Sequence, residues 1–149
     1  MTQKGVSSPF CLAEKMMDYF YPQMSEQDVN KISMLGLAHI GDGVYELLTR
    51  TILCTRGHSS VIELHKLTVS YVNAPAPAVA AEKILPLLSE KESAVYRRGR
   101  NAKVNSVPHN ANIAQYHAAT GLEALFGWLY LQGRTERIGQ LFAAIMEET

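Results

Sequence analysis

The spacing of apolar residues constrains the fold of this chain more than any other feature of its sequence. Along Leu37–Leu48, apolar residues recur every three or four positions, which is the repeat of one face of a helix. No segment of the sequence alternates polar and apolar residues for long enough to predict a strand. We therefore expect an all-α fold of six to seven helices in a single domain.

Capping signals predict where these helices begin and end. Ser60 with Glu63, and Ser89 with Glu92, have the spacing of a capping box, and Gly57 and Gly133 are expected to stop the helices before them. The expected helices run from Ser8 and Pro9 towards Tyr19, from Ser33 to about Arg56, from Ser60 to about Val72, from Pro75 and Pro77 to about Leu85, from Ser89 into the basic residues after Tyr96, from Asn110 or Asn112 to Leu131, and from about Thr135 to Met146.

The composition fits one globular domain. The chain has 149 residues, of which 47% are hydrophobic and 19% charged, so it can bury a core and does not read as a disordered chain. Polar residues interrupt the longest apolar runs and the N-terminus has no signal-peptide pattern, so we expect a cytoplasmic protein without a membrane span. Cys11 and Cys54 lie among apolar residues and are expected to be buried, reduced thiols.

The distribution of charge is more informative than its sum. Fourteen basic and fourteen acidic residues give a net charge of zero, yet no acidic residue lies between Glu92 and Glu123. Four basic residues fall in that interval, and two histidines accompany them: Arg97, Arg98, Arg100 and Lys103, with His109 and His117. The interval is therefore a local positive field, through which a neutral protein can bind a polyanion.

One acidic residue, Asp42, lies between two glycines in an otherwise apolar helix. Glycine in a helix costs about 1 kcal/mol relative to alanine, so Gly41 and Gly43 call for a packing reason. The pattern fits an acid held on a rigid helix beside a narrow site, where it binds a metal ion. It fits equally well a surface aspartate on the polar side of the helix.

A second acid, Glu123, is alone among apolar and small residues from Thr120 to Leu131. A carboxylate in such surroundings needs a cation, a hydrogen-bond network or a raised pKa. Two such acids on two apolar helices suggest a shared metal site where the helices cross, although sequence spacing alone does not prove that they meet.

The basic run YRRGRNAK, from Tyr96 to Lys103, is the candidate nucleic-acid contact. Arginine donates two parallel hydrogen bonds to phosphate oxygens, and asparagine can contact sugar or phosphate. The alternative is a solvated helix end, where the cations interact favourably with the helix dipole. The absence of acidic residues between Glu92 and Glu123 favours RNA binding through five residues: Arg97, Arg98, Arg100, Asn101 and Lys103.

These three segments together resemble the catalytic domain of the ribonuclease III family. Residues 38–44 read AHIGDGV and residues 120–127 read TGLEALFG, similar to the two acidic signature helices of that family. The short form of the family, Mini-ribonuclease III, resembles the chain over nearly its whole length, including His65-Lys66 and the run RRGRNAK from Arg97.

The chain also departs from the full-length enzymes of that family. Ala38 and Thr120 stand where those enzymes carry metal-binding acids, which leaves Asp42 and Glu123 as the expected catalytic and metal-binding pair. Residues 1–149 are expected to form one ribonuclease III-like catalytic domain with no double-stranded-RNA-binding domain, so that RNA recognition depends on the basic run.

The resemblance implies a specific activity and assembly. It implies a Mg²⁺-dependent endoribonuclease, with Mn²⁺ as a substitute, that hydrolyses double-stranded RNA to leave a 5′-phosphate and matures a precursor of large-subunit ribosomal RNA. It also implies a homodimer, and the apolar face around Leu37, Ile40, Val44 and Leu48 is the expected seam. Mg²⁺ commonly binds through one or two carboxylates plus a substrate phosphate, so two acids are sufficient.

Two other classes of protein remain open from the sequence. One is a catalytically idle RNA-binding or ribosome-assembly factor, in which both acids are structural. The other is a metal-dependent nucleotide phosphohydrolase, whose usual acidic and histidine clusters are missing here. No paired ligand spacing links the histidines, so His39 is expected to pack near the dimer seam, while His109 and His117 are candidate RNA contacts. Glu46 is a reserve metal ligand that is expected to pair with Arg50 instead.

Overall fold

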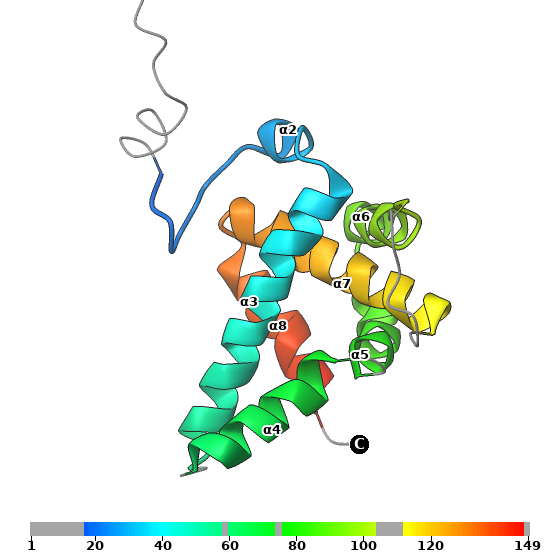
Figure 1. Cartoon of the computed structure of the whole chain (residues 1–149). Coiled ribbons are helices and arrows are strands. Elements are labelled where there is room, and N and C mark those ends of the chain that lie inside the picture. The colour runs from blue at the N-terminus through cyan, green and yellow to red at the C-terminus, as the bar shows by residue number, and fades with distance from the viewer. Residues whose placement is uncertain (1–16, 58–59, 74–75, 104–111, 148–149) are drawn as a thin grey trace, which may run out of the picture.

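The computed structural model describes residues 17–57, 60–73, 76–103 and 112–147. These residues form seven α-helices and one short 3₁₀ helix, and the described part of the chain contains no strand (Figure 1). The elements are α2 (Glu26–Val29), α3 (Met34–Thr55), α4 (Val61–Val72), α5 (Ala76–Ile84), η1 (Leu85–Leu87), α6 (Glu90–Arg100), α7 (Ile113–Leu131) and α8 (Thr135–Met146). The predicted all-α class is confirmed.

Local capping explains most helix starts. Ser33, Ser60, Ser89 and Asn112 each accept a hydrogen bond from a backbone N–H in the first turn of the following helix. At Ser89 the capping box is complete, because Glu92 also accepts from the Ser89 N–H at 2.8 Å. The predicted starts of α3, α4, α6 and α7 therefore agree with the structure.

One expected helix ends within one residue of its predicted end, one short helix was not expected, and one expected helix lies mostly outside the described part. The helix after the two prolines ends at Ile84, and the chain then tightens into η1, where Pro86 is accommodated. The short helix α2 was not predicted, because four residues carry too little periodicity. The helix expected from Ser8 towards Tyr19 falls almost entirely outside the described residues.

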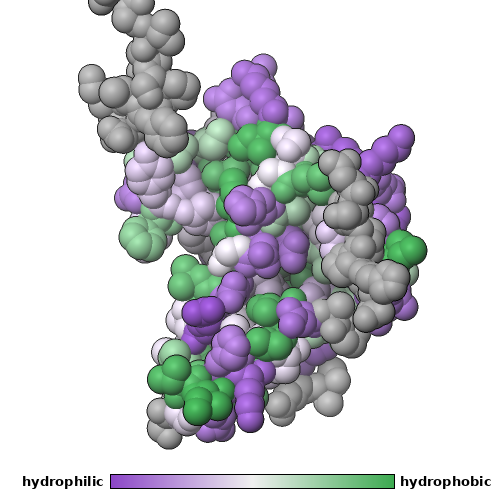
Figure 2. Space-filling view, viewed as in Figure 1, coloured by the Kyte–Doolittle hydropathy of each residue, from purple (hydrophilic) through white to green (hydrophobic). Residues whose placement is uncertain are grey.

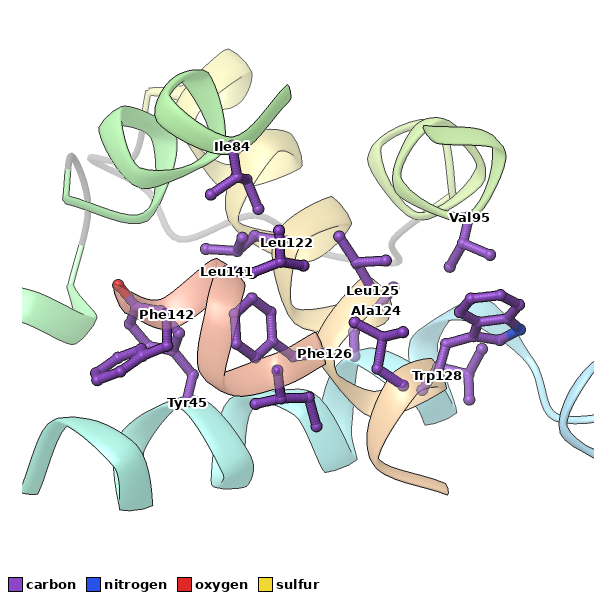
Figure 3. Packing of buried hydrophobic residues seen from close by; sticks show 14 of the residues in the cluster. Tyr45, Ile84, Val95, Leu122, Ala124, Leu125, Phe126, Trp128, Leu141 and Phe142 are labelled. Carbon is purple, nitrogen blue, oxygen red and sulfur yellow. The ribbon is translucent and has the colours of Figure 1, made fainter. Parts of the chain in front are cut away.

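Helix α7 is the centre of the molecule. It packs against α3, α5, α6 and α8, and ten of its residues are buried. Tyr45 of α3 meets Phe126 and Phe142 edge to face, with ring centres 5.6 and 5.8 Å apart (Figure 3). The indole N–H of Trp128 donates to the side-chain oxygen of Asn30 at 3.0 Å, which ties α7 to the segment before α3.

A buried ion pair joins α6 to α8. Glu92 is 1% exposed, and its carboxylate accepts two hydrogen bonds from the Arg137 guanidinium, at 2.8 and 2.9 Å. Arg137 also donates to the Leu87 carbonyl oxygen at 2.7 Å. The Arg137 guanidinium is the main reason that the pKa of Glu92 is lowered. Glu92 therefore caps its own helix and fixes α6 against the C-terminal helix.

Two expectations about the surface can be compared with the structure. None of the described helices is long and apolar enough to cross a membrane. The thiol of Cys54 is exposed, so its predicted burial is wrong: it lies on the outer side of the last turn of α3. Cys11 lies outside the described residues.

Candidate active site

The site is built where α3 crosses α7, and glycines allow the two helices to touch. A side chain at Gly41 would overlap the carbonyl oxygen of Glu123 and would come within 2.9 Å of the Gly127 nitrogen. A side chain at Gly127 would likewise overlap the carbonyl oxygen of Leu37. By contrast, nothing in the described chain lies within 4 Å of a Cβ at Gly43. Gly41 and Gly127 are therefore the pair that sets this crossing.

The crossing brings Asp42 and Glu123 into electrostatic contact. The pKa of Glu123 is raised to about 8. Burial of the carboxyl group is the larger cause, and the negative charge of Asp42 is the second. Burial also raises the pKa of Asp42, with a smaller contribution from Glu46 and an opposing one from His39. Asp42 is the more exposed of the two, so it loses its proton first and its charge then disfavours ionisation of Glu123.

No lysine or arginine of the described residues balances either carboxylate. Among the described residues, no Lys or Arg lies within ion-pair distance of Asp42 or Glu123, and neither acid makes a hydrogen bond. Glu46 pairs with Arg50 at 2.9 Å, as predicted, so its carboxylate is already balanced. Two neighbouring carboxylates, of which Glu123 is the more desolvated and neither has a lysine or arginine partner, are an arrangement that a divalent cation would stabilise.

The described residues supply only these two acids at the crossing. No group of three or more His, Cys, Asp or Glu side chains suited to a metal gathers anywhere in the described part. Ala38 is 6% exposed and offers no ligand, and the hydroxyl of Thr120 donates to the Tyr116 carbonyl oxygen at 3.1 Å. A metal bound here would therefore depend on two carboxylates, with further oxygens from water or substrate.

The basic run forms the exposed end of α6. Its members Arg97, Arg98, Arg100, Asn101 and Lys103 are all exposed. None of the four cations among them pairs with a carboxylate of the described residues. Close packing at Gly99 and Gly121 seats α6 on α7, since a side chain at Gly99 would come within 2.8 Å of the Ala124 Cβ. The same helix that carries Glu123 therefore also supports the basic run.

The histidines take different positions. His39 is exposed on α3, and His109 lies outside the described residues. His117 is half-buried on α7, where its Nδ1 atom is buried and has no hydrogen-bond partner.

An apolar groove of about 480 Å³ opens beside the site. Ile40, Val44 and Leu48 of α3 line it, as the sequence predicted for an apolar face, but Leu37 is 0% exposed and belongs to the chain's own core. Eight further residues line the groove, and the sequence did not indicate them as members: Tyr19, Phe20, Gly43, Leu47, Tyr130, Thr135, Ile138 and Gly139. In the view of Figure 2, hydrophobic atoms border a hollow at the left edge of the molecule, beside α3.

Comparison with known proteins agrees with this architecture. The Ribonuclease III domain family matches residues 35–134, which include both helices of the crossing. The chain belongs to the ribonuclease III family, and within it to the short Mini-ribonuclease 3 group. It is therefore a metal-dependent endoribonuclease.

Individual relatives show how far the likeness extends. The chain is 44% identical over 110 residues to Mini-ribonuclease 3 of Symbiobacterium thermophilum, covering 74% of this chain and 85% of the relative. It is 43% identical over 128 residues to that of a Thermoanaerobacter species, covering 84% and 90%. A crystal structure of a Fusobacterium nucleatum protein is 29% identical with a TM-score of 0.72, covering 80% of this chain and 95% of that one.

Proposed function

We propose that the chain cleaves double-stranded RNA with Mg²⁺ held by Asp42 and Glu123. The observation that carries this proposal is the unbalanced carboxylate pair at the α3–α7 crossing, where burial raises the pKa of Glu123 to about 8. A divalent cation would offset the repulsion between the two charges and would draw the proton from Glu123. Mg²⁺ is the expected ion because it prefers carboxylate oxygens, and Mn²⁺ is expected to substitute for it.

The residues of the chain hold and orient the reacting groups. When bound, the ion supplies Lewis acidity, which makes water a better nucleophile and stabilises negative charge on the phosphate. Asp42 and Glu123 would hold it in place, since they lie on two helices whose backbones approach closely at Gly41 and Gly127. Hydrolysis that leaves a 5′-phosphate needs no histidine, which agrees with a pair made of two carboxylates.

The exposed end of α6 is the proposed RNA contact. Arg97, Arg98, Arg100, Asn101 and Lys103 present unpaired donors towards solvent. Side chains cannot easily enter the deep major groove of A-form RNA, so phosphate and sugar contacts should dominate recognition. We expect the natural substrate to be a precursor of large-subunit ribosomal RNA, processed in the cytoplasm, on the basis of the family resemblance.

We also propose that two copies assemble through the apolar groove. Ile40, Val44 and Leu48 are partly buried in one chain, while Leu47 and Phe20 are 60% and 77% exposed. A second copy would cover this apolar surface, and two-fold dimers are the commonest assembly. Each copy would then supply one complete carboxylate pair, and each pair would cut one RNA strand.

Substitution of the pair tests the proposed function. Asp42→Asn and Glu123→Gln keep the side-chain volume but remove a metal-binding charge, so each should lower Mg²⁺-dependent cleavage of duplex RNA at least about a thousandfold. Binding of the RNA should stay near wild type, and both variants should remain folded. The control is Glu46→Gln, which lies one turn from Asp42 and should retain activity because Glu46 pairs with Arg50.

Wild-type turnover by either Asp42→Asn or Glu123→Gln would contradict the two-carboxylate site. Duplex binding that is equal with and without Mg²⁺, with the RNA left intact, would instead indicate an idle RNA-binding factor.

A further inference from the structure

The surroundings of the carboxylate pair are poor in further metal ligands. In a helix, residues three or four positions apart are neighbours on one side, so each acid has four such neighbours on its own helix. These neighbours are Ala38, His39, Tyr45 and Glu46 on α3, and Ala119, Thr120, Phe126 and Gly127 on α7. Four of the eight are Ala, Phe or Gly, whose side chains contain no oxygen or nitrogen. Half of the positions that adjoin the pair, where α3 crosses α7 in Figure 1, therefore offer no ligand.

Two of the remaining neighbours carry hydroxyl groups that are neutral and buried. The Thr120 hydroxyl donates to the Tyr116 carbonyl oxygen at 3.1 Å within its own helix, and Thr120 is 6% exposed. Tyr45 packs edge to face against Phe126 and Phe142 in the core. Burial raises the pKa of Tyr45 to about 12, so its phenol carries no charge at neutral pH. Neither hydroxyl supplies the anionic oxygen that a further divalent ion would need.

The last two neighbours, Glu46 and His39, do not extend the pair either. The Glu46 carboxylate lies 2.9 Å from the Arg50 guanidinium, so its charge is already balanced. His39 offers a nitrogen ligand, whereas Mg²⁺ and Mn²⁺ prefer oxygen. The described residues gather no third acid, thiol or imidazole into a metal-binding group with the pair. The anionic charge available at the crossing is therefore that of Asp42 and Glu123.

This charge is sufficient for one divalent ion. Sites that hold two ions place them about 3.5–4 Å apart, where the two ions repel each other strongly. Such sites need enough anionic ligands to offset four positive charges. The carboxylates of Asp42 and Glu123 carry two negative charges when ionised, which match one ion. Ala38 and Thr120, each one turn before an acid and each 6% exposed, occupy positions from which further carboxylates could join the pair.

We propose that each chain holds a single divalent ion between Asp42 and Glu123, and that Ala38 and Thr120 deny a second ion its ligands. The proposal rests on the proposed function, because it concerns the ion that acts in cleavage. Ala38 and Thr120 do not touch the ion in this arrangement. They limit the metal content of the site through the charge that they fail to supply.

The first test counts Mn²⁺ ions bound to the full chain without RNA. Calorimetric titration of wild type is compared with that of the double variant Asp42→Asn with Glu123→Gln, so that ions bound elsewhere on the surface cancel. Wild type should bind one Mn²⁺ more per chain than the double variant. Its electron paramagnetic resonance spectrum should be that of an isolated ion, without exchange coupling to a second one.

Two outcomes of this count would contradict the proposal, and they differ in their meaning for the proposed function. Two additional Mn²⁺ ions per wild-type chain, or an exchange-coupled spectrum, would overturn the single ion. If Asp42→Asn still abolished cleavage, the proposed function would then stand. Equal binding by wild type and the double variant would overturn both, because the two acids would hold no ion.

The second test supplies the missing charge. Ala38→Glu with Thr120→Asp brings the crossing to four carboxylates, so the count should rise from one Mn²⁺ per chain to two, with an exchange-coupled spectrum. The matched control is Ala38→Gln with Thr120→Asn, which has nearly the same side-chain volumes without the charge and should stay at one. A folded four-carboxylate variant that still bound one ion would show that Ala38 and Thr120 do not limit the site. Circular dichroism checks the fold, and the wild-type count stays decisive if this variant does not fold.

Discussion

Burial controls the proton affinity of the two acids at the helix crossing. The pKa of Glu123 is about 8, and its largest cause is desolvation, followed by the charge of Asp42. A free glutamate has a pKa near 4.5. Without a cation, the folded chain therefore holds a proton on Glu123 at neutral pH, and binding of a divalent metal should release it.

Metal-free protein should lose stability as the pH rises from about 4.5 to about 8. In this window the folded state keeps the Glu123 proton while the unfolded state has lost it, so the free energy of unfolding falls with rising pH. Glu123→Gln removes this contribution. Between pH 5 and pH 8.5, the unfolding free energy of the variant should therefore rise by about 1–3 kcal/mol relative to that of wild type, measured by urea unfolding in EDTA.

Asp42→Asn is the matched control for this effect. It removes the neighbouring charge, so it should lower the pKa of Glu123 without returning it to 4.5, because burial remains. Side-chain NMR titration measures that pKa directly. A wild-type pKa near 4.5 for Glu123 would contradict the account of the site.

At the level of helices, close contact of α3 and α7 fixes the distance between the acids. Gly41→Ala would place a methyl group on the Glu123 carbonyl oxygen, so the helices would have to separate. We expect a loss of about 3 kcal/mol or more in unfolding free energy, and a loss of cleavage in the protein that remains folded. Chemical denaturation and RNA cleavage measure the two effects.

Gly43→Ala is the control on the same helix. A methyl group there meets nothing in the described chain, so it should raise the unfolding free energy by up to about 1 kcal/mol through helix propensity. Gly43 also lines the apolar groove, so sedimentation should accompany the measurement. Equal stability of the two alanine variants would show that the crossing does not depend on Gly41.

The Glu92–Arg137 pair should make the contact between α6 and α8 sensitive to acid. The guanidinium lowers the pKa of Glu92, so this pair stabilises the fold above the ordinary glutamate pKa of 4.5 and the stabilisation is lost as the pH falls. This direction is opposite to that of Glu123. Glu92→Gln should cost about 1–3 kcal/mol at pH 7, measured by urea unfolding, because it removes the charge that balances the partly buried Arg137 guanidinium.

The control for that pair is Glu136→Gln, an exposed acid next to Arg137 in sequence. It should change stability by less than about 0.5 kcal/mol. If Glu92→Gln also changed stability this little at pH 7, the ion pair would not stabilise the α6–α8 contact.

For the whole molecule, the proposed dimer predicts a separation of binding from double-strand cleavage. A mixed dimer of wild-type and Asp42→Asn chains should bind duplex RNA normally and nick one strand. Leu47→Glu should give monomers in sedimentation with an unchanged fold, because Leu47 is exposed in the single chain and lines the groove. Val61→Glu is the matched control, since Val61 is 80% exposed on α4 outside the groove.

Wild-type protein that sediments as a monomer at working concentration would remove the basis for this prediction. Double-strand cuts by a verified mixed dimer would show that one carboxylate pair serves both strands.

Local sequence was sufficient to predict most helix boundaries. A cap is a hydrogen bond between residues three positions apart, so Ser33, Ser60 and Ser89 determine where their helices begin whatever surrounds them. The two candidate acids also stood out locally, as single charges in apolar helices. Burial of Cys54 could not be read in the same way, because it depends on which side of the last turn of α3 faces the core.

Only the tertiary structure decided which residues meet. Asp42 and Glu123 come together because backbones touch at Gly41 and Gly127, and that packing depends on residues far apart in the chain. The same holds for Leu37, whose apolar character is evident from sequence but whose burial within its own chain follows from the close approach of α7. Sequence thus determined the helices and the available chemistry. Long-range packing determined that Asp42 and Glu123 meet, because contacts between distant residues exist only once the helices have docked.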